Sequence, residues 1–133
     1  MIKIYTDGSC LKPQGPGGYA FVIIEECGDE YYFCEGESNT TNNRMEIKAV
    51  IESLKCIKEN QTCIIYSDSK LAINCASGIW KRNKNLDLWT EYDTVCKNKK
   101  VNFEWVKGHS NNYYNEKVDK LALREAQIVN SLF

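Results

Sequence analysis

The chain has 133 residues, of which 43% are hydrophobic, and 17 basic against 18 acidic residues give it a net charge of -1. This length supports one hydrophobic core and excludes two ordinary domains, so we expect a single domain over residues 1–133. No run approaches the roughly 20 apolar residues of a membrane span, and the first residues lack a secretory signal. We therefore expect a cytoplasmic protein and not a membrane protein. The balanced charge excludes nucleic-acid binding by bulk electrostatics.

The N-terminal third of the chain has the pattern of an antiparallel meander. Residues 2–6 alternate apolar and polar side chains, and residues 19–26 and 30–37 are rich in β-branched and aromatic side chains. The glycine- and proline-rich residues 11–18 are typical of a turn between the first two strands. Three strands are therefore predicted in this region.

The period then changes to that of an amphipathic helix, which begins near Asn43 and fades by Asn60. Thr41, Asn42 or Asn43 can cap it. The remaining predicted elements are a strand at 63–66, helices at 69–76 and 86–96, a strand at 101–106 and a helix at 115–129. A crossover between the fourth and fifth strands favours parallel pairing, so we expect an α/β fold with a mixed five-stranded sheet, three strands antiparallel and two parallel, flanked by helices.

Seven cysteines accompany a single histidine, and no CxxC pair is present. This composition argues against a zinc site and against a disulfide framework. Four of the cysteines lie in apolar sequence surroundings and are predicted to be buried, reduced thiols, as in a reducing cytoplasm. These are Cys56, Cys63, Cys75 and Cys96.

Four carboxylates occupy positions where predicted elements begin or end. Asp7 stands where the first strand runs out, Asp68 follows the fourth strand, Glu46 lies in the first turn of its helix, and Asp119 lies in the first turns of the last helix. Any one of them alone is explained as a turn former or a helix cap. Together they can converge at one sheet edge, where α/β proteins usually bind ligands.

Acidic side chains that converge repel one another unless cations lie among them. Oxygen ligands suit Mg²⁺ or Mn²⁺, and two such ions about 4 Å apart can hold both the attacking water and the leaving oxygen of a phosphodiester. The four carboxylates therefore predict a metal-dependent phosphodiesterase.

Five sequence segments resemble the ribonuclease H type 1 family, in the family's order and over nearly the whole chain. They are YTDGSC at 5–10, GPGG at 15–18, TTNNRME at 40–46, SDS at 67–69 and EWVKGH at 104–109, followed by Asn115, Glu116 and Asp119. The resemblance implies an endoribonuclease that hydrolyses the RNA strand of RNA/DNA hybrids and leaves 5′-phosphate and 3′-hydroxyl ends. It also implies two Mg²⁺ ions, with Mn²⁺ as the substitute.

The resemblance assigns roles to individual residues. Asp7 would bridge the two ions, Asp68 would complete the site of the ion that activates water, and Glu46 and Asp119 would help to hold the ion near the leaving group. His109, in a glycine-containing loop, would assist proton transfer or product release, since histidine exchanges protons near neutral pH.

Choosing RNA over DNA requires a contact to the 2′-hydroxyl. By resemblance, Asn42, Asn43 and backbone groups around Cys10 would face the RNA minor groove. Thr41 and Asn85 would belong to a pocket for a DNA phosphate. We expect Lys70, which stands where the family often has glutamine, to contact the substrate as well. Helix capping is the alternative explanation for the asparagines.

The chain departs from many cellular family members because it lacks a long basic protrusion; only residues 79–89 occupy that place. We therefore expect weaker hybrid affinity than in relatives that carry it. The C-terminal residues 127–133 faintly resemble peptides that dock on a sliding clamp, but we favour a frayed helix end that packs its last residues on the domain. We expect a monomer. The alternatives are another nuclease of the same fold and a non-catalytic module that binds hybrids.

Overall fold

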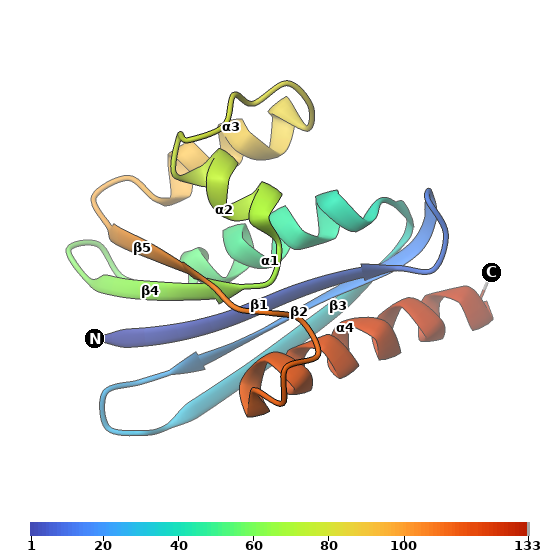
Figure 1. Cartoon of the computed structure of the whole chain (residues 1–133), viewed down its shortest axis with the longest axis horizontal. Coiled ribbons are helices and arrows are strands. Elements are labelled where there is room, and N and C mark those ends of the chain that lie inside the picture. The colour runs from blue at the N-terminus through green and yellow to red at the C-terminus, as the bar shows by residue number, and fades with distance from the viewer. Residues whose placement is uncertain (133) are drawn as a thin grey trace.

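The computed structural model describes residues 1–132 and contains five strands and four helices (Figure 1). The strands are β1 (Ile2–Cys10), β2 (Gly15–Ile24), β3 (Glu30–Thr40), β4 (Thr62–Ser67) and β5 (Lys100–Trp105). The helices are α1 (Asn42–Lys55), α2 (Lys70–Ala76), α3 (Leu86–Val95) and α4 (Tyr113–Leu132). The order of strands and helices agrees with the order predicted from the sequence.

The five strands form one mixed sheet in the order β3-β2-β1-β4-β5. Strands β1, β2 and β3 pair antiparallel, whereas β4 pairs parallel with β1, and β5 pairs parallel with β4. The predicted α/β fold is therefore confirmed. The parallel pairs follow from the helical crossovers, because a tight turn cannot return the chain in the same direction.

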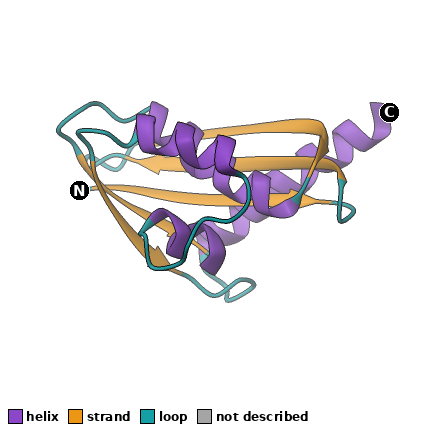
Figure 2. Ribbon diagram, turned by 90° about the horizontal axis from the view of Figure 1, so that it is seen from above, coloured by secondary structure: helices purple, strands orange, loops and turns teal. Residues whose placement is uncertain are grey.

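Helices cover both faces of the sheet, as Figure 2 shows from above. Side chains alternate between the two faces along each strand. In β1, Ile4 packs in the core beneath α1 and α3, and its neighbour Tyr5 packs in the second core beneath α4. In β2, Phe21 and Val22 divide in the same way. This double burial explains why β1 and β2 are apolar on both faces.

The prediction that residues 15–18 form a turn was wrong, because these glycines are the first part of β2. A Cβ atom at Gly18 would collide with the backbone of α4 at Ala122, and one at Gly36 in β3 would collide with the Val129 side chain. The glycines let α4 lie directly on the sheet. The glycine-rich segment is therefore a packing surface, and only residues 11–14 turn the chain.

The cysteine prediction was correct for two residues and wrong for two. Cys63 and Cys75 are buried, whereas Cys96 is half-buried and Cys56, just past the end of α1, is exposed. All seven cysteines are free thiols. The sequence around Cys56 is apolar, but the helix turns this position away from the core formed by its neighbours Leu54 and Ile57.

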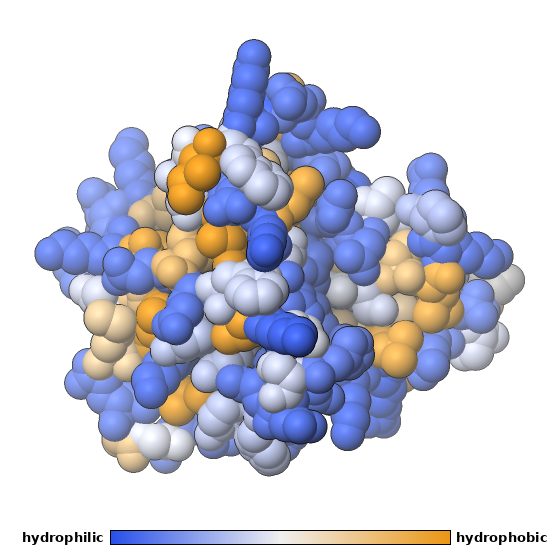
Figure 3. All heavy atoms as spheres, in the orientation of Figure 1, coloured by the Kyte–Doolittle hydropathy of each residue, from blue (hydrophilic) through white to orange (hydrophobic). Residues whose placement is uncertain are grey.

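Within residues 1–132, none of the helices combines the length and the hydrophobicity that spanning a membrane requires. Figure 3 shows hydrophobic residues as separate patches among hydrophilic ones on the face in view. The C-terminal segment, which faintly resembles a clamp-docking peptide, is helical through Leu132, and Phe133 lies outside the described residues.

Candidate active site

The register between β1 and β4 places two carboxylates side by side. The last pair of this parallel ladder is Tyr5 and Tyr66, whose rings stack with centroids 4.5 Å apart. Asp7 lies two residues beyond Tyr5 within β1, and Asp68 lies two residues beyond Tyr66, just past the end of β4. The register of this strand pair therefore brings Asp7 and Asp68 close together.

The position of Asp7 differs from the prediction. We expected it at the end of β1, but β1 continues to Cys10 because β2 pairs with it throughout, and Asp7 lies opposite Ala20. The strand that ends here is β4, immediately before Asp68. Asp7 is thus a mid-strand residue with only 4% of its surface exposed, and it lies beyond the last residue of β1 that pairs with β4.

Helix α1 brings the third carboxylate, Glu46. The N–H of Gly8 donates a hydrogen bond to Oε1 of Glu46, and a Cβ at Gly8 would collide with the backbone of Met45 and Glu46. Only glycine therefore lets α1 approach β1 so closely. Because α1 begins at Asn42, Glu46 lies in its second turn and not, as predicted, in the first.

The three carboxylates form one compact group. Asp7, Glu46 and Asp68 each present an oxygen atom, and these atoms lie within 4.8 Å of one another. Asp7 and Glu46 are buried and Asp68 is half-buried. Asp119, on α4, is not one of this group of three, but its side chain adjoins Asp7, and its charge adds to burial in raising the pKa of Asp68. All four predicted carboxylates are therefore neighbours.

The electrostatics of the group are unfavourable without a cation. Burial, followed by the charge of Glu46, raises the pKa of Asp7 far above its ordinary value. Burial and the charge of Asp68 also raise the pKa of Glu46. Carboxylates shift in this way when desolvation and like charges oppose ionisation. A hard divalent cation among these oxygens would remove the repulsion, so the donor set fits such an ion.

The loop after β5 lies against Asp68. The indole Nε1 of Trp105 donates a hydrogen bond of 3.1 Å to the backbone oxygen of Asp68, and a Cβ at Gly108 would lie 3.0 Å from Asp68 Oδ2. His109 follows Gly108, is exposed, and has a left-handed backbone with φ of 54°. The structure thus brings the His109 loop to the carboxylates, but among residues 1–132 the imidazole makes no hydrogen bond to them.

The residues predicted to contact substrate surround the start of α1. Thr41 caps this helix, since its Oγ1 accepts a hydrogen bond from Arg44 N, and Asn42 and Asn43 are exposed in the first turn. Cys10 Sγ donates to the backbone oxygen of Thr40 at 3.4 Å, which ties the end of β1 to the entrance of α1. Capping by Thr41 leaves both asparagine side chains without that task.

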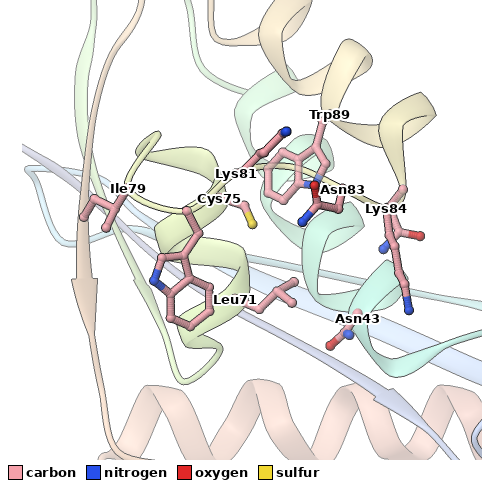
Figure 4. Close-up of a pocket in the computed structure, with 10 residues that line it drawn as sticks. Asn43, Leu71, Cys75, Ile79, Lys81, Asn83, Lys84 and Trp89 are labelled. Atoms are coloured by element: carbon pink, nitrogen blue, oxygen red, sulfur yellow. The ribbon is translucent and has the colours of Figure 1, made fainter.

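Two further predicted contacts lie beside this site. Lys70, in the first turn of α2, holds its Nζ 4.7 Å from the centre of the Trp105 ring. Asn85 precedes α3 and lines a cavity of about 620 Å³ (Figure 4). The side chains around this cavity are Asn43, Leu71, Cys75, Ile79, Trp80, Lys81, Asn83, Lys84, Asn85 and Trp89. The cavity joins the exposed end of α1 to the segment that replaces the basic protrusion.

Sequence reasoning missed three contributors to this site. Gly8 belongs to the YTDGSC segment, but the sequence did not predict its contact with α1, which positions Glu46. Trp80 and Asn83 were not predicted to line a cavity with Asn43. The glycine directly after Asp7 could have indicated a close approach of another backbone. The cavity depends on the path of residues 77–85, which no periodic sequence pattern predicts.

Comparison with known proteins supplies independent information. A family model described as RNase H matches residues 1–127. A ribonuclease H from Ehrlichia ruminantium is 41% identical and aligns with 96% of this chain and 94% of its own length. A ribonuclease HI from Campylobacter jejuni is 43% identical, over 96% of this chain and 91% of its own.

Solved structures agree on the fold. The N-terminal RNase H domain of a Mycobacterium tuberculosis protein superposes with a TM-score of 0.85 at 23% identity, covering 98% of this chain and 96% of that one. LC11-RNase H1, solved in complex with an RNA/DNA hybrid, gives a TM-score of 0.81 at 21% identity, covering 96% and 98%. At such identities the likeness shows a shared fold.

Proposed function

The chain belongs to the ribonuclease H family, and we propose that it is an endonuclease that hydrolyses the RNA strand of RNA/DNA hybrids and leaves 5′-phosphate and 3′-hydroxyl ends. The observation that carries this proposal is the group of three carboxylates within 4.8 Å, two of them buried. Buried carboxylates so close together resist ionisation, and a bound divalent cation would compensate for both their burial and their mutual repulsion. Residues 1–133 would form the whole of this ribonuclease H domain.

The cofactor would be Mg²⁺, two ions to a site, with Mn²⁺ able to replace it. Asp7, Glu46, Asp68 and Asp119 would hold the ions. When bound, the pair would supply Lewis acidity that activates a water and stabilises the leaving 3′-oxygen. Asp7 would be the ligand shared by the two ions, because it belongs to the group with Glu46 and Asp68 and also adjoins Asp119.

The protein's own groups would orient the substrate around these carboxylates. The groups that would contact the 2′-hydroxyl of the RNA strand are Asn42, Asn43 and the backbone around Cys10, because they lie at the N-terminus of α1, the helix that carries Glu46. Lys70 would contact the substrate beside Asp68. His109 would accept or release a proton during product departure, and its exposed loop against Asp68 leaves it free to move.

The DNA strand would be held away from the carboxylates. Thr41 and Asn85 would bind one of its phosphates, and the cavity that Asn85 shares with Lys81 and Lys84 would accept the neighbouring backbone. We expect the protein to act as a monomer. A sliding clamp or another replication protein remains a proposed partner of the C-terminus, tested by clamp capture with and without the last three residues.

The test of this function labels each strand of an RNA/DNA hybrid separately and adds Mg²⁺, Mn²⁺ or EDTA. We expect cleavage of the RNA strand alone, with either metal and not with EDTA. Cleavage of the DNA strand, or equal cleavage of double-stranded RNA, would instead favour another nuclease of the same fold. Tight hybrid binding without cleavage in either metal would favour a non-catalytic binding module.

A further inference from the structure

Asn85 has an unusual backbone and an unusual hydrogen bond. It stands at the N-cap of α3 with a left-handed conformation, φ 56° and ψ 37°, and its side chain makes no capping bond to the helix. Its Oδ1 instead accepts a hydrogen bond of 3.1 Å from Arg44 Nη1. Asparagine tolerates this conformation better than most residues, but the capping role that usually explains an asparagine here is absent.

Arg44 is itself fixed by a second partner. Its Nη1 and Nη2 donate to the two carboxylate oxygens of Asp87 at 3.0 and 2.7 Å. This bidentate geometry fixes the orientation of the guanidinium. This hydrogen bond lowers the pKa of Asp87 to about 2, so the pair stays ionised at neutral pH. Arg44 also donates its backbone N–H to Thr41 Oγ1. One residue of α1 therefore bonds both Thr41 and Asn85.

The bond from Arg44 decides which end of the Asn85 amide is left for a ligand. With Oδ1 occupied by the guanidinium, the remaining group is the Nδ2 donor, which suits an anionic oxygen. If the amide flipped, Oδ1 would meet that anion and repel it. Asn85 shares its cavity with Lys81 and Lys84, so the surroundings are also suited to a negative charge.

We propose that Arg44, held by Asp87, is a positioning residue that presents the Asn85 amide to a phosphate of the DNA strand. This inference rests on the proposed function and adds to it the pair that sets the orientation of one substrate contact. Because Asp87 neutralises Arg44, the guanidinium acts through Asn85 and does not bind the phosphate itself. The pair therefore controls KM and leaves the chemical step at the carboxylates unaffected.

The test substitutes Asp87→Asn and uses Asp93→Asn as a matched control. Asp93 is on the same helix and forms an equally close pair with Arg82, with both oxygens 2.8 Å from Nη1, but this pair does not bond Asn85. We expect D87N to raise KM for a hybrid about tenfold, the value of one hydrogen bond to a charged group, with kcat changed less than about twofold. D93N is expected to change neither.

A second readout identifies the phosphate. Hybrids carry one neutral methylphosphonate at successive positions of the DNA strand, and in the unsubstituted protein one position should raise KM. In D87N this penalty should disappear. Asn85→Gly, which keeps the left-handed backbone because glycine adopts it readily, should remove the same penalty. The double variant N85G/D87N should be no weaker than N85G alone, since both changes act through one contact.

Three results would overturn the inference. They are equal behaviour of D87N and D93N, a methylphosphonate penalty that persists in D87N, and additive losses in the double variant. The same hybrids are also tested for binding in EDTA by fluorescence anisotropy, where Kd should follow the KM pattern without any cleavage. Failure of the unsubstituted protein to cleave RNA would therefore count against the proposed function separately from this inference.

Discussion

The carboxylate group and the cavity lined by Asn85 are built in opposite ways. Asp7, Glu46 and Asp68 emerge from the sheet and a packed helix, and their relative positions follow from strand register and one glycine contact. The cavity is formed mainly by residues 77–85, which are loop, and Asn85 is oriented there by a single side-chain hydrogen bond from Arg44. The proposed catalytic carboxylates are thus held by the sheet and a packed helix, whereas the proposed substrate-binding cavity is formed mainly by a loop.

This contrast explains how the chain can lack a basic protrusion and keep the group of carboxylates that we propose as the metal site. A change in residues 77–85 does not alter the register of β1 and β4, because no residue of the loop pairs with either strand. Loops tolerate such changes better than the elements they connect. Substitutions in the two regions should therefore affect different quantities, kcat in the first and affinity in the second.

The largest expected effect is that of Asp7→Asn. Loss of the central carboxylate should lower kcat at least about 10²-fold, the scale of losing one preorganised electrostatic group. Initial rates on a hybrid with labelled RNA measure it, with Asp29→Asn, an exposed acid in the β2–β3 turn, as the control. Activity within a few-fold of the unsubstituted protein would refute the central role of Asp7.

The next effect is that of Gly8→Ala, which adds a single methyl group between β1 and α1. Because this methyl would collide with the backbone at Met45 and Glu46, α1 must shift, and we expect a loss of about 1–3 kcal/mol of stability. Activity should fall more than about tenfold, because Glu46 moves with the helix. Gly15→Ala, where the new Cβ would meet only the Lys12 side chain at 3.5 Å, should leave both unchanged. Equal stability of the two variants would contradict the close approach.

A basic segment grafted after Trp80 should change only the affinity for the hybrid. Each added phosphate contact releases counterions, so hybrid affinity at low salt should rise about tenfold and the salt dependence should steepen. Binding by the Asp7→Asn variant, with and without the graft, measures this affinity. In the protein that retains Asp7, the graft should change kcat less than about twofold. A neutral insertion of equal length is the control, and an equal gain from it would show that charge is not the cause.

The smallest effect concerns stability without metal. Burial raises the pKa values of Asp7, Glu46 and Asp68, so the folded state binds protons that the unfolded state has released. Stability from these groups is present below the usual carboxyl pKa of about 4 and is lost as pH rises above it. In EDTA, Tm should therefore fall from about pH 5 to 8.

The Asp7→Asn variant removes one member of the repelling group, so its Tm should depend less on pH. Mg²⁺ should restore the Tm of the unsubstituted protein at pH 8, because a bound cation stabilises the folded state by mass action. Thermal melts with EDTA or Mg²⁺ at several pH values measure both effects. Parallel pH profiles for the two proteins would show that the carboxylate group does not strain the fold.

The sequence by itself determined the kinds and order of the elements, because helices and strands leave local periods of 3.6 and 2 residues. It also indicated the carboxylate group, since each acid stands within a distinctive short segment. It misassigned residues 15–18, because glycines that serve as a packing surface have the same local signature as a turn.

Only the tertiary structure decided how these pieces meet. The register of Tyr5 on Tyr66 puts Asp7 beside Asp68, the contact at Gly8 brings Glu46 to them, and Arg44 reaches Asn85 across 41 positions of the chain. Such contacts join residues far apart in sequence and depend on packing between elements. A single sequence carries no periodic trace of them, which is why the acids were predictable and their mutual geometry was not.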